Sequence, residues 1–377
     1  MRVRLGEVCE INMGQSPASS TYNEEEKGLP FFQGNADFGE IYPTARIWCD
    51  EPTKVAHIGD ILISVRAPIG ALNLSNCKCC IGRGLAALTV NKNICLQKYL
   101  WYVLAGKNGE LNSNGTGSTF KAINKNILAE TEIPLPSLGE QHKIVMLLDK
   151  VSGVIAERRK QVERLDDLVK SRFIEMFGDP VQNPKGWVKK PFLSMGNCKN
   201  GMNFHYEDVG IEIHCLGVGD FKDLTVIDNA EKLPKVSLNK MPSEEYLLKD
   251  GDIVFVRSNG NKALVGRSVA VYPSNVPTTF SGFCIRYRKT DDAILAPYLL
   301  RVLKADSMRQ KMVGRGANIQ NLNQQILETL EIPVPSIELQ NQFAAFVQQT
   351  DKLELAVQKS LEKLEILKKS LMQQYFG

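Results

Sequence analysis

Apolar residues recur at helical spacing in two long, proline-free stretches of the chain. Within 336–377 they step by three and four, which is typical of a helix that packs along one face. Within 137–178 apolar residues occupy the equivalent places. We therefore predict two long helices that pair with each other through these side chains: Ile144, Leu147, Val151, Val154, Leu165, Leu168, Phe343, Phe346, Leu353, Val357, Leu364, Leu367 and Leu371.

The predicted contact face of the first helix is interrupted by polar residues. Arg158, Gln161 and Arg172 fall at positions that would face the second helix. Polar residues at such positions can fix the register of a helix pair. They can equally face a helix of another subunit, and the sequence leaves both interpretations open.

The two stretches form the end of a longer internal repeat. Residues 98–178 align with 297–377 without a gap, at an offset of 199 positions. Upstream of these ranges the two copies align only with gaps, which indicates a rigid frame that carries diverged loops. The shared marks are Glu132-Ile133-Pro134-x-Pro136-Ser137 against Glu331-Ile332-Pro333-x-Pro335-Ser336, Gln141 against Gln340, and Phe177-Gly178 against Phe376-Gly377.

Each copy starts with shorter patterns that predict a mixed α/β module. In the first copy, runs at 61–65 and 85–90 predict strands, whereas 96–104 and 124–128 predict helices. A proline pair ends the module. Ser137, followed three residues later by a glutamate, can form a capping box that starts the long helix.

These elements predict an α+β fold with a pseudo-twofold internal repeat, in which two long antiparallel helices form a coiled coil that separates two globular modules. A helix of this length spans roughly 55 Å at about 1.5 Å per residue, so the pair is expected to act as a spacer that holds the modules apart. The expected segments are a first module at 1–136, a first spacer helix at 137–178, a linker at 179–186, a second module at 187–335 and a second spacer helix at 336–377.

Composition makes a DNA-binding function possible without requiring it. The formal net charge of +4 is mild for a chain of 377 residues. No apolar run reaches the roughly 18 residues that cross a bilayer, and the basic N-terminus lacks the apolar core of a signal peptide. We therefore expect a cytoplasmic protein with no membrane partner.

The nine cysteines lack a paired framework, which is typical of reduced thiols. Cys77, Cys79 and Cys80 form a cluster, but a zinc site needs two spaced pairs, and the four histidines offer no companion spacing. We expect no metal in this chain and interpret the cluster as buried or strand-borne thiols, with zinc as the less favoured alternative.

Motifs that mark enzymes are missing from the sequence. We find no Gly-x-x-x-x-Gly-Lys phosphate loop, no Gly-x-Gly-x-x-Gly after a strand, no His-Glu-x-x-His and no Asn-Pro-Pro-aromatic signature of amino-methyltransferases. Asp60 and Asp252 recur in both copies, but an aspartate before a strand is most simply a turn residue. We expect no catalytic residue, although many active sites have no linear signature.

Loops at strand ends, rich in Gly, Asn, Gln, Ser and Arg, recur in both copies. Glycine lets a backbone approach a nucleic-acid strand closely, arginine can bond guanine edges, and asparagine or glutamine can bond adenine edges. Any one of these residues can instead be an ordinary solvated loop residue. The DNA-contact candidates are Gln15, Ser16, Gln33, Asn35, Arg66, Thr116, Ser118, Thr119 and Lys121 in the first module and Asn203, Lys222, Arg257, Asn259, Asn261, Lys262, Arg315, Asn318 and Gln320 in the second.

Two comparisons between the copies refine this prediction. Arg66 and Arg257 are interpreted as equivalent residues after the same strand, which favours contact with DNA at both. Other equivalent positions differ in chemistry, as two readers of different sequences require. These positions are Gln33 against Leu216 and Thr116 against Arg315.

Three features together resemble the specificity subunit of type I restriction-modification systems, over the whole chain. They are the doubled Ile-Pro-x-Pro-Ser…Gln marks, the Gly-Asp-Ile-Leu-Ile-Ser-x-Arg stretch at 59–66, and the mid-chain motif Phe177-Gly178-Asp179-Pro180…Asn183-Pro184-x-Gly186-Trp187. The resemblance implies that the two modules are target-recognition domains, each reading one half of a split, asymmetric double-stranded DNA site. It implies that the helices set the spacer and bind methyltransferase subunits.

The resemblance also implies which chemistry lies outside this chain. The expected partners are two methyltransferase (modification) subunits and restriction (helicase-nuclease) subunits, which use S-adenosylmethionine, ATP and magnesium. The specificity subunit itself would carry no cofactor and no catalytic residue. Two alternatives stay open: a stand-alone regulator that binds an interrupted DNA site, and a single-chain DNA methyltransferase or nuclease with an unrecognised active site.

Overall fold

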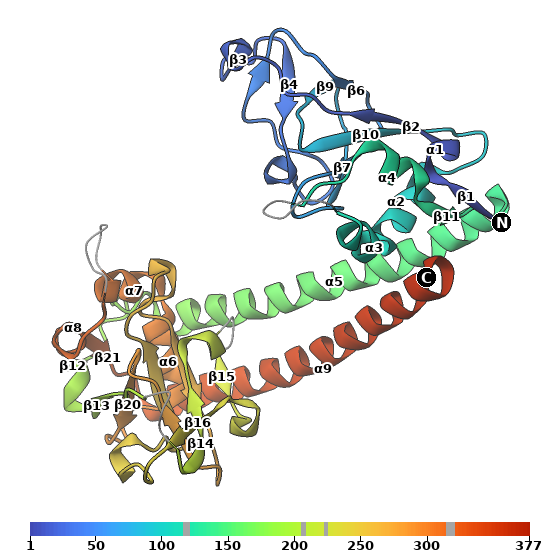
Figure 1. The fold of residues 1–377 in the computed structure, drawn as a ribbon. Helices are drawn as coiled ribbons and strands as arrows, with labels where there is room; N and C mark the ends of the chain where they lie inside the picture. The colour runs from blue at the N-terminus through green and yellow to red at the C-terminus, as the bar shows by residue number, and fades with distance from the viewer. Residues whose placement is uncertain (116–120, 205–208, 222–224, 314–320) are drawn as a thin grey trace. The chain divides into compact units, whose positions relative to one another are not determined.

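The computed structural model describes the chain except for residues 116–120, 205–208, 222–224 and 314–320, and it divides into two compact units (Figure 1). Unit 1 consists of Met1–Lys160 with Gln358–Gly377, and unit 2 of Gln161–Val357. Each unit therefore contains one predicted module and a part of both long helices. This division differs from the predicted one, in which each long helix was a segment of its own.

Unit 1 is built on two sheets. The first has the order β2 (Cys9–Met13), β10 (Leu85–Val90), β7 (Ile61–Ser64) and β8 (Leu72–Leu74), all antiparallel. The second has the order β3 (Tyr22–Asn23), β5 (Trp48–Cys49), β4 (Leu29–Phe32), β9 (Cys79–Ile81) and β6 (Val55–Ala56), with β4 parallel to β9. A ribbon of β1 (Arg2–Arg4) and β11 (Glu132–Pro134) and the helices α1 (Leu5–Val8), α2 (Gln97–Gly106), α3 (Asn108–Ser113) and α4 (Lys125–Glu130) accompany them.

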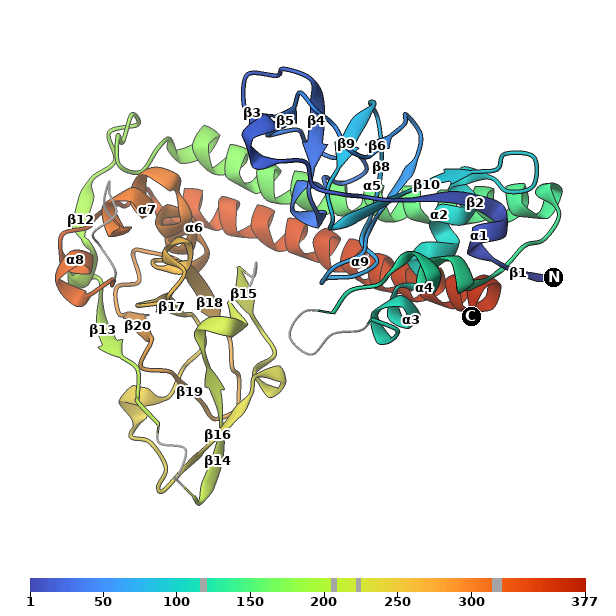
Figure 2. The same cartoon turned by 45° about the horizontal axis from the view of Figure 1, so that its top comes forward.

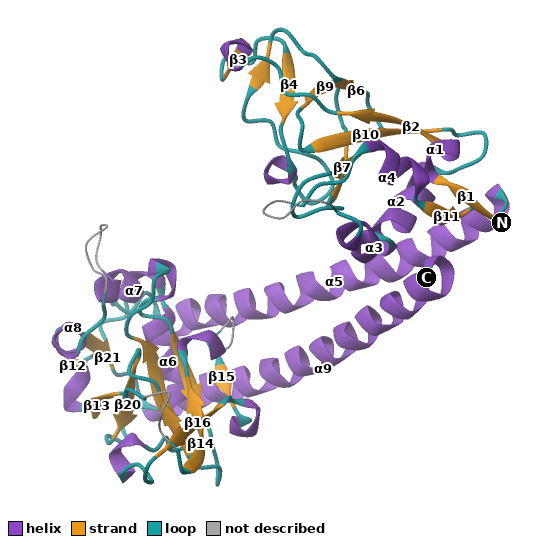
Figure 3. Ribbon diagram, viewed as in Figure 1, coloured by secondary structure: helices purple, strands orange, loops and turns teal. Residues whose placement is uncertain are grey.

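Unit 2 repeats this plan, as the colouring by secondary structure shows (Figure 3). Its main sheet has the order β13 (Gly196–Asn200), β20 (Cys284–Lys289), β17 (Asp252–Val256), β18 (Ser268–Val271) and β15 (Val226–Ile227). Its second sheet has the order β16 (Lys235–Leu238), β14 (Ile211–Leu216) and β19 (Thr278–Phe280), with β14 parallel to β19. The ribbon pairs β12 (Lys189–Pro191) with β21 (Glu331–Pro333), and the helices are α6 (Ala296–Lys304), α7 (Asp306–Val313) and α8 (Gln324–Glu328).

The central strands of the two units correspond, although their sheets differ in the number of strands at the edges. Strands β9 and β10 match β19 and β20 at the same offset of 199 as the helices, so the ungapped repeat reaches upstream to residue 79. Strand β7 is the counterpart of β17, but their offset differs from 199. The alignment therefore needs a gap in the segment between this strand and β9 or β19. The prediction of a duplicated α+β fold with mixed modules and two long helices is confirmed.

The long helices are α5 (Leu138–Phe177) and α9 (Ile337–Phe376). Within each unit they lie side by side and run in opposite directions, which two views show (Figures 1 and 2). The start of α5 has the predicted capping box, because the Ser137 amide donates to Glu140 Oε2 at 3.3 Å and the Glu140 amide donates to Ser137 Oγ at 3.4 Å. This local signal therefore fixes where the helix begins.

A buried glutamine locks each long helix onto its module. The Gln141 side chain accepts from the Leu96 amide at 2.8 Å and donates to the carbonyls of Ile94 and Pro136, both at 2.9 Å. Gln340 in unit 2 repeats all three bonds at the same lengths, with Leu295, Ala293 and Pro335. Both glutamines are fully buried, so each amide satisfies groups that water cannot reach.

Aromatic residues at the helix ends complete the two cores. Phe376, near the end of α9, lies edge-on to Tyr99 in unit 1, with ring centroids 5.7 Å apart. Phe177, at the end of α5, lies edge-on to Tyr298 in unit 2, at 4.7 Å. Each tyrosine hydroxyl donates to a proline carbonyl of the Ile-Pro-x-Pro-Ser motif. The end of each repeat copy thus enters the core of the unit that holds the other copy's module.

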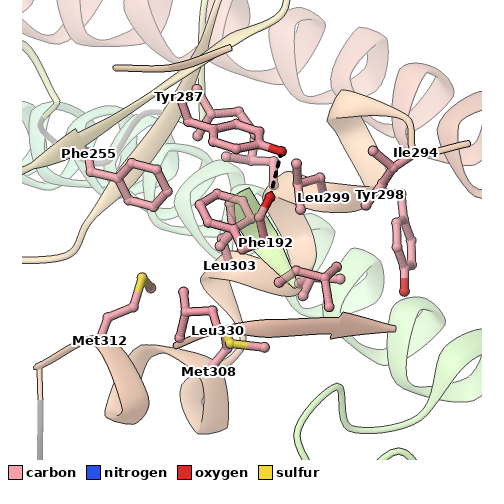
Figure 4. Close-up of a cluster of buried hydrophobic side chains, with 14 of the residues drawn as sticks. Phe192, Phe255, Tyr287, Ile294, Tyr298, Leu299, Leu303, Met308, Met312 and Leu330 are labelled. Carbon is pink, nitrogen blue, oxygen red and sulfur yellow. Dashed lines mark hydrogen bonds between the residues drawn. The ribbon is translucent and has the colours of Figure 1, made fainter. Parts of the chain in front are cut away.

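Figure 4 shows the core of unit 2, in which side chains from strands and short helices converge. The rings of Phe192 and Tyr287 stack with centroids 4.0 Å apart, and the Tyr287 hydroxyl donates to the Phe192 carbonyl at 3.2 Å. Phe173, Phe177 and Phe343 from the long helices belong to the same buried cluster. The helices are therefore part of the module core.

The mid-chain motif forms a closed turn between α5 and β12. The Asn183 side chain accepts from the Trp187 amide at 3.0 Å and donates to the Trp187 carbonyl at 2.7 Å. The Trp187 indole donates to the Phe177 carbonyl at 3.1 Å, which satisfies one of the carbonyls at the end of α5. Gly178 has φ of +77°, the left-handed conformation that ends helices and favours glycine.

The predicted contact face of the long helices needs correction. Five of its residues are exposed by 38% to 60%, namely Leu147, Val154, Leu168, Leu353 and Leu367. The buried positions of α5 include Val145, Leu148, Ile155 and Val169 instead. The heptad interpretation failed because each helix packs against a module core as well as against the other helix, and a straight helix drifts from a seven-residue repeat.

The other predicted contact residues lie on or near the packed faces. Ile144 and Leu371 pack against the core of unit 1, and Phe343 and Phe346 belong to or pack against that of unit 2. Val151 is buried, whereas Leu165, Val357 and Leu364 are half-buried. The polar residues Arg158 and Gln161 are half-buried, and Arg172 pairs with Glu175 at 2.7 Å on the surface of α5.

Among the helices of the described residues, none combines the length and the apolar character that a membrane-spanning segment needs.

We predict that Gln340→Ala lowers the free energy of unfolding by about 2 to 4 kcal/mol, because it leaves one amide and two carbonyls without partners in a buried site. Urea titration followed by circular dichroism measures this change. The control is Gln348→Ala, an exposed glutamine on the same helix, which should change stability by less than about 0.5 kcal/mol. Equal effects of the two substitutions would contradict the locking role of Gln340.

Candidate nucleic-acid interface

The turn that joins β9 to β10 in unit 1 is a meeting point of three predicted loops. We call residues 82–84, and their counterparts 281–283 in unit 2, the central turn. The Gly82 amide donates to the Phe32 carbonyl at 2.8 Å and the Gly84 amide to the Gln33 carbonyl at 3.1 Å. The Gly84 carbonyl accepts from the Val65 amide at 2.9 Å. The loops that follow β4 and β7 are therefore both tied to this turn by their backbones.

A third loop reaches the same turn. The Gln15 amide donates to the Ile81 carbonyl at 3.0 Å, and Ser16 Oγ accepts from the Arg83 amide at 3.3 Å. The backbones pack so closely that a Cβ atom on Gly84 would overlap the Gln33 carbonyl oxygen. Glycine is required at this point for close approach of two backbones.

Arg83 lies at the tip of the central turn, and the sequence analysis missed it. Its side chain is exposed, and among the described residues no hydrogen bond or ion pair engages its guanidinium. The signal in the sequence was the triplet Gly82-Arg83-Gly84, in which two glycines flank an arginine between two strands. This triplet lies upstream of 98–178, in the part of the repeat that was expected to align only with gaps.

The remaining described candidates of unit 1 lie in the loops after β2, β4 and β7 or on the segment that pairs with the last of these loops. Gln15 and Gln33 are exposed, and Asn35 begins a short 3₁₀ turn whose Asp37 carboxylate accepts from the Gln33 amide at 2.8 Å. Arg66 is exposed and pairs through its backbone with Ala122, and the Lys121 carbonyl accepts from the Ala67 amide at 3.2 Å. Arg66 and Lys121 therefore lie on adjacent backbone segments.

Unit 2 builds the same turn with different side chains. The Gly201 amide donates to the Cys284 carbonyl at 3.0 Å and the Met202 amide to the Phe280 carbonyl at 3.1 Å, as the Gly14 and Gln15 amides do in unit 1. A Cβ atom on Gly282 would overlap Oδ1 of Asn203, so the candidate Asn203 lies directly against the central turn.

Arg257 also reaches the central turn of unit 2. Its Nη1 donates to the Gly282 carbonyl at 3.1 Å, and its backbone amide donates to the Phe283 carbonyl at 2.8 Å. The structure thus brings Asn203 and Arg257 together at one turn, although they are far apart in the sequence. The guanidinium is partly engaged in holding the turn, which the sequence could not show.

The predicted equivalence of Arg66 and Arg257 is wrong by one residue. The Val65 carbonyl accepts from the Ile123 amide at 2.9 Å, and the Arg257 carbonyl accepts from the Leu322 amide at 2.8 Å. Arg257 is therefore the counterpart of Val65. Arg66 instead corresponds to Ser258, since Arg66 bridges Ala122 and Ser258 bridges Asn321. Successive residues of an extended strand point to opposite sides, so the two arginines do not occupy the same place.

The predicted pairing of Gln33 with Leu216 is also wrong. The parallel ladder pairs Phe32 with Ile81 in unit 1 and Leu216 with Phe280 in unit 2, so Leu216 corresponds to Phe32. The 3₁₀ turns that follow make Gly34 and Gly217 equivalent. Unit 1 therefore has one extra residue here, Gln33, which lies beside the central turn.

In the loop that follows β17 in unit 2, two of the predicted contact residues form hydrogen bonds within the loop itself. Asn259 Oδ1 accepts from the Asn261 amide at 2.8 Å, and Asn261 Oδ1 accepts from the Ala263 amide at 3.0 Å. Lys262 is exposed in the same loop. The carbonyl oxygens of both asparagines thus have partners within the loop. The candidates Thr116, Ser118, Thr119, Lys222, Arg315, Asn318 and Gln320 lie outside the described residues, so the pairing of Thr116 with Arg315 is not tested.

The recurring aspartates hold the frame. Asp60 Oδ2 accepts from the His57 amide at 2.7 Å, and Asp252 Oδ2 accepts from the Lys249 amide at 2.8 Å, so both close a turn before a strand. Asp252 is also held by Arg288 at 2.7 Å. Asp60 and Asp252 are therefore turn residues, as the sequence analysis predicted, and both carboxylates have a structural role.

Titratable groups near the interface are held in their uncharged forms. Burial raises the pKa of the Cys79 thiol to about 12, and Cys80 in the same strand is shifted in the same direction by burial. Burial also raises the pKa of Tyr22, and the neighbouring Arg83 guanidinium partly opposes that shift. Among the described residues, no three His, Cys, Asp or Glu side chains gather as metal ligands would.

Comparisons with known proteins connect this geometry to one family. A sequence model described as the type I restriction modification DNA specificity domain matches residues 1–164 and 216–366. A protein of Methanocaldococcus jannaschii assigned as the specificity subunit of the type I restriction enzyme MjaX is 44% identical over 166 residues, which cover 44% of this chain and 39% of that protein. This match thus spans well under half of the relative's length.

Two further comparisons extend over the whole chain. The specificity subunit of the Escherichia coli type I restriction enzyme EcoBI is 20% identical over 437 aligned positions, covering 100% of this chain and 85% of that protein. The crystal structure of the S subunit of a type I restriction-modification system from M. genitalium has the same fold, with a TM-score of 0.57, 16% identity and coverage of 100% and 96%. With two matched segments that together make up most of its length, the chain belongs to the family of type I restriction-modification DNA specificity proteins.

Proposed function

We propose that the chain is the sequence-recognition subunit of a type I restriction-modification complex, in which each unit reads one half of a split, asymmetric DNA site. One observation carries the proposal: the same central turn is built twice, on matching strands, with different side chains around it. In unit 1 the turn carries Arg83 and lies beside Gln33, and in unit 2 it contacts Asn203 and Arg257. The backbone of the turn is alike in the two units, whereas the side chains around it differ, so the two units can recognise different half-site sequences.

The side chains of unit 1 suit contact with base edges. Arginine presents a planar fork of donors that fits the two acceptors of guanine in the major groove, and glutamine can donate to and accept from adenine. Arg83 and Gln33 are exposed and attached to a backbone that neighbouring strands hold in place. A side chain on a fixed backbone loses less conformational freedom on binding, which favours specific contacts.

Exposed apolar residues favour a scaffold role for the long helices. Several of their apolar side chains point to solvent, among them Met146 and Ile366 in unit 1, exposed by 71% and 69%, and Leu353 in unit 2. Exposed apolar side chains of this size on a long helix are available for contact with a partner protein. We assign these surfaces to two modification subunits, with restriction subunits joining the complex. S-adenosylmethionine, ATP and magnesium would then act in those partners, in the cytoplasm, and this chain would carry no catalytic step.

We predict that Arg83→Ala costs about 1 to 3 kcal/mol of discrimination at one or two base pairs of a single half-site, because one base-edge contact is lost. Competition binding with single-base-pair variants of the preferred duplex measures this. Arg4→Ala, which removes another exposed arginine of unit 1, is the control and should leave discrimination unchanged. An equal loss on all sequences with a shallower salt dependence would show that Arg83 contacts only phosphate.

We also predict that the long helices set the distance between the half-sites. Deleting seven residues from the middle of both α5 and α9 removes about 10 Å of helix and should shorten the preferred gap by about three base pairs. The half-site sequences should stay the same. Selection of bound duplexes from pools with variable gaps measures the change, and an unchanged gap would contradict a spacer role.

A third prediction separates the subunit from an enzyme acting alone. The purified chain, incubated with its preferred duplex and radiolabelled S-adenosylmethionine, should transfer no methyl group. Addition of the modification subunits should start the transfer. Methyl transfer by the chain alone would establish a single-chain methyltransferase. Full affinity and selectivity of the chain alone, unchanged by the added subunits, would instead favour a stand-alone regulator.

A further inference from the structure

Phe283, in the central turn of unit 2, exposes its ring to solvent. It is 61% exposed, and it is the only exposed phenylalanine or tryptophan among the described residues. The other described phenylalanines are buried or half-buried. A single exposed apolar side chain is common on protein surfaces, so the exposure of Phe283 matters here only together with its rigidly held backbone and its polar neighbours.

The backbone that carries the ring is firmly held. The Phe283 carbonyl accepts from the amides of Arg257 at 2.8 Å and Ser258 at 3.3 Å, and the Phe283 amide donates to Ser281 Oγ at 3.3 Å. The preceding residue, Gly282, donates to the Met202 carbonyl at 2.6 Å and accepts from Arg257 Nη1 at 3.1 Å. The ring therefore projects from a turn that is fixed on both sides.

The frame itself does not require an aromatic residue there. The counterpart of Phe283 in unit 1 is Gly84, because Val65 donates to the Gly84 carbonyl as Arg257 donates to the Phe283 carbonyl. Gly84 forms the same backbone bond with no side chain at all. Phe283 also belongs to none of the hydrophobic clusters that the described residues of unit 2 form. Among those residues its ring has no part in a core.

The neighbours of the ring define the chemistry that it would meet. Asn203 lies against Gly282, and Arg257 donates to the same residue, so an amide and a guanidinium flank the turn. These are the side-chain types that bond adenine and guanine edges in the major groove. In that groove the one apolar group that base pairs present is the C5-methyl group of thymine, and apolar side chains contact it.

We infer that Phe283 contacts the thymine methyl group of one base pair in the half-site read by unit 2. The inference rests on the proposed DNA-recognition function and adds a specificity-determining residue to it. Contact at the edge leaves the bases stacked, whereas insertion of the ring between base pairs would cost a few kcal/mol of unstacking. Unit 1, with Arg83 and Gly84 in the same turn, would read its half-site by hydrogen bonds alone at this point.

The test removes the methyl group and the ring separately and together. The preferred duplex is first selected from a randomised pool with the full-length chain in the presence of its modification subunits. Each thymine of the half-site assigned to unit 2 is then replaced by deoxyuridine, which lacks only the C5-methyl. At one position this replacement should weaken binding by wild type about threefold to tenfold. Phe283→Ala should weaken binding to the thymine duplex by a similar factor and be insensitive to deoxyuridine at that position.

Controls keep the outcomes distinct. Val188→Ala removes another exposed apolar side chain of unit 2 and should leave binding and its response to deoxyuridine unchanged. Thermal unfolding should show that Phe283→Ala is folded, since the ring is not part of a core. If the chain selects a site but no thymine is coupled to Phe283, this inference is overturned while the proposed function stands. Enhanced 2-aminopurine fluorescence that depends on Phe283 would overturn it in favour of a wedge, and failure to select any sequence would overturn both.

Discussion

The fold depends on a ring contact at the end of each long helix. Phe376 closes the core of unit 1 against Tyr99, and Phe177 closes the core of unit 2 against Tyr298. Each phenylalanine belongs to one copy of the repeat and each tyrosine to the other, because the helix that starts in one unit ends in the other. Neither unit can complete its core from a single copy, so the duplicated sequence must fold as a pair.

This constraint explains which parts of the repeat stay alike and which differ. Gln141 and Gln340 make the same three buried bonds, and both tyrosines bond a proline carbonyl of the Ile-Pro-x-Pro-Ser motif. These groups cannot change without leaving buried polar atoms unpaired. The central turn is held mainly through backbone atoms, which every residue supplies, with added side-chain bonds from Ser16 in unit 1 and Arg257 in unit 2. Side chains there, such as Arg83 and Phe283, are therefore free to differ between the units.

Long-range pattern and local signals made the fold predictable from the sequence. The gap-free repeat, the proline pair and the capping box at Ser137 predicted two helices and two modules of one kind, and the strand at 85–90 was predicted with the bounds that it has. These features are local or repeated, so one copy supports the interpretation of the other. The buried face of the helices was not predictable in the same way, because it depends on which module each helix meets.

The interface was predictable only as a set of loops. Polar composition indicated the loops around β4, β7 and β17, but which residues meet is fixed by strand pairing across distant parts of the chain. A shift of one residue, as between Arg66 and Arg257, changes the side of a strand and is invisible in a gapped alignment. Arg83 and Phe283 were missed because a single arginine or phenylalanine beside glycine resembles an ordinary turn.

Hydrogen exchange of the full-length chain measures the central claim most directly, since it resolves the stability of each unit separately. Phe376→Ala, although it changes the penultimate residue of the chain, should speed the exchange of amides in β2, β7 and β10 of unit 1 and leave β17 and β20 of unit 2 protected. Phe177→Ala should do the reverse. If Phe376→Ala instead loosens unit 2, or has no effect on the sheet of unit 1, the proposed exchange of helix ends between the two cores is contradicted.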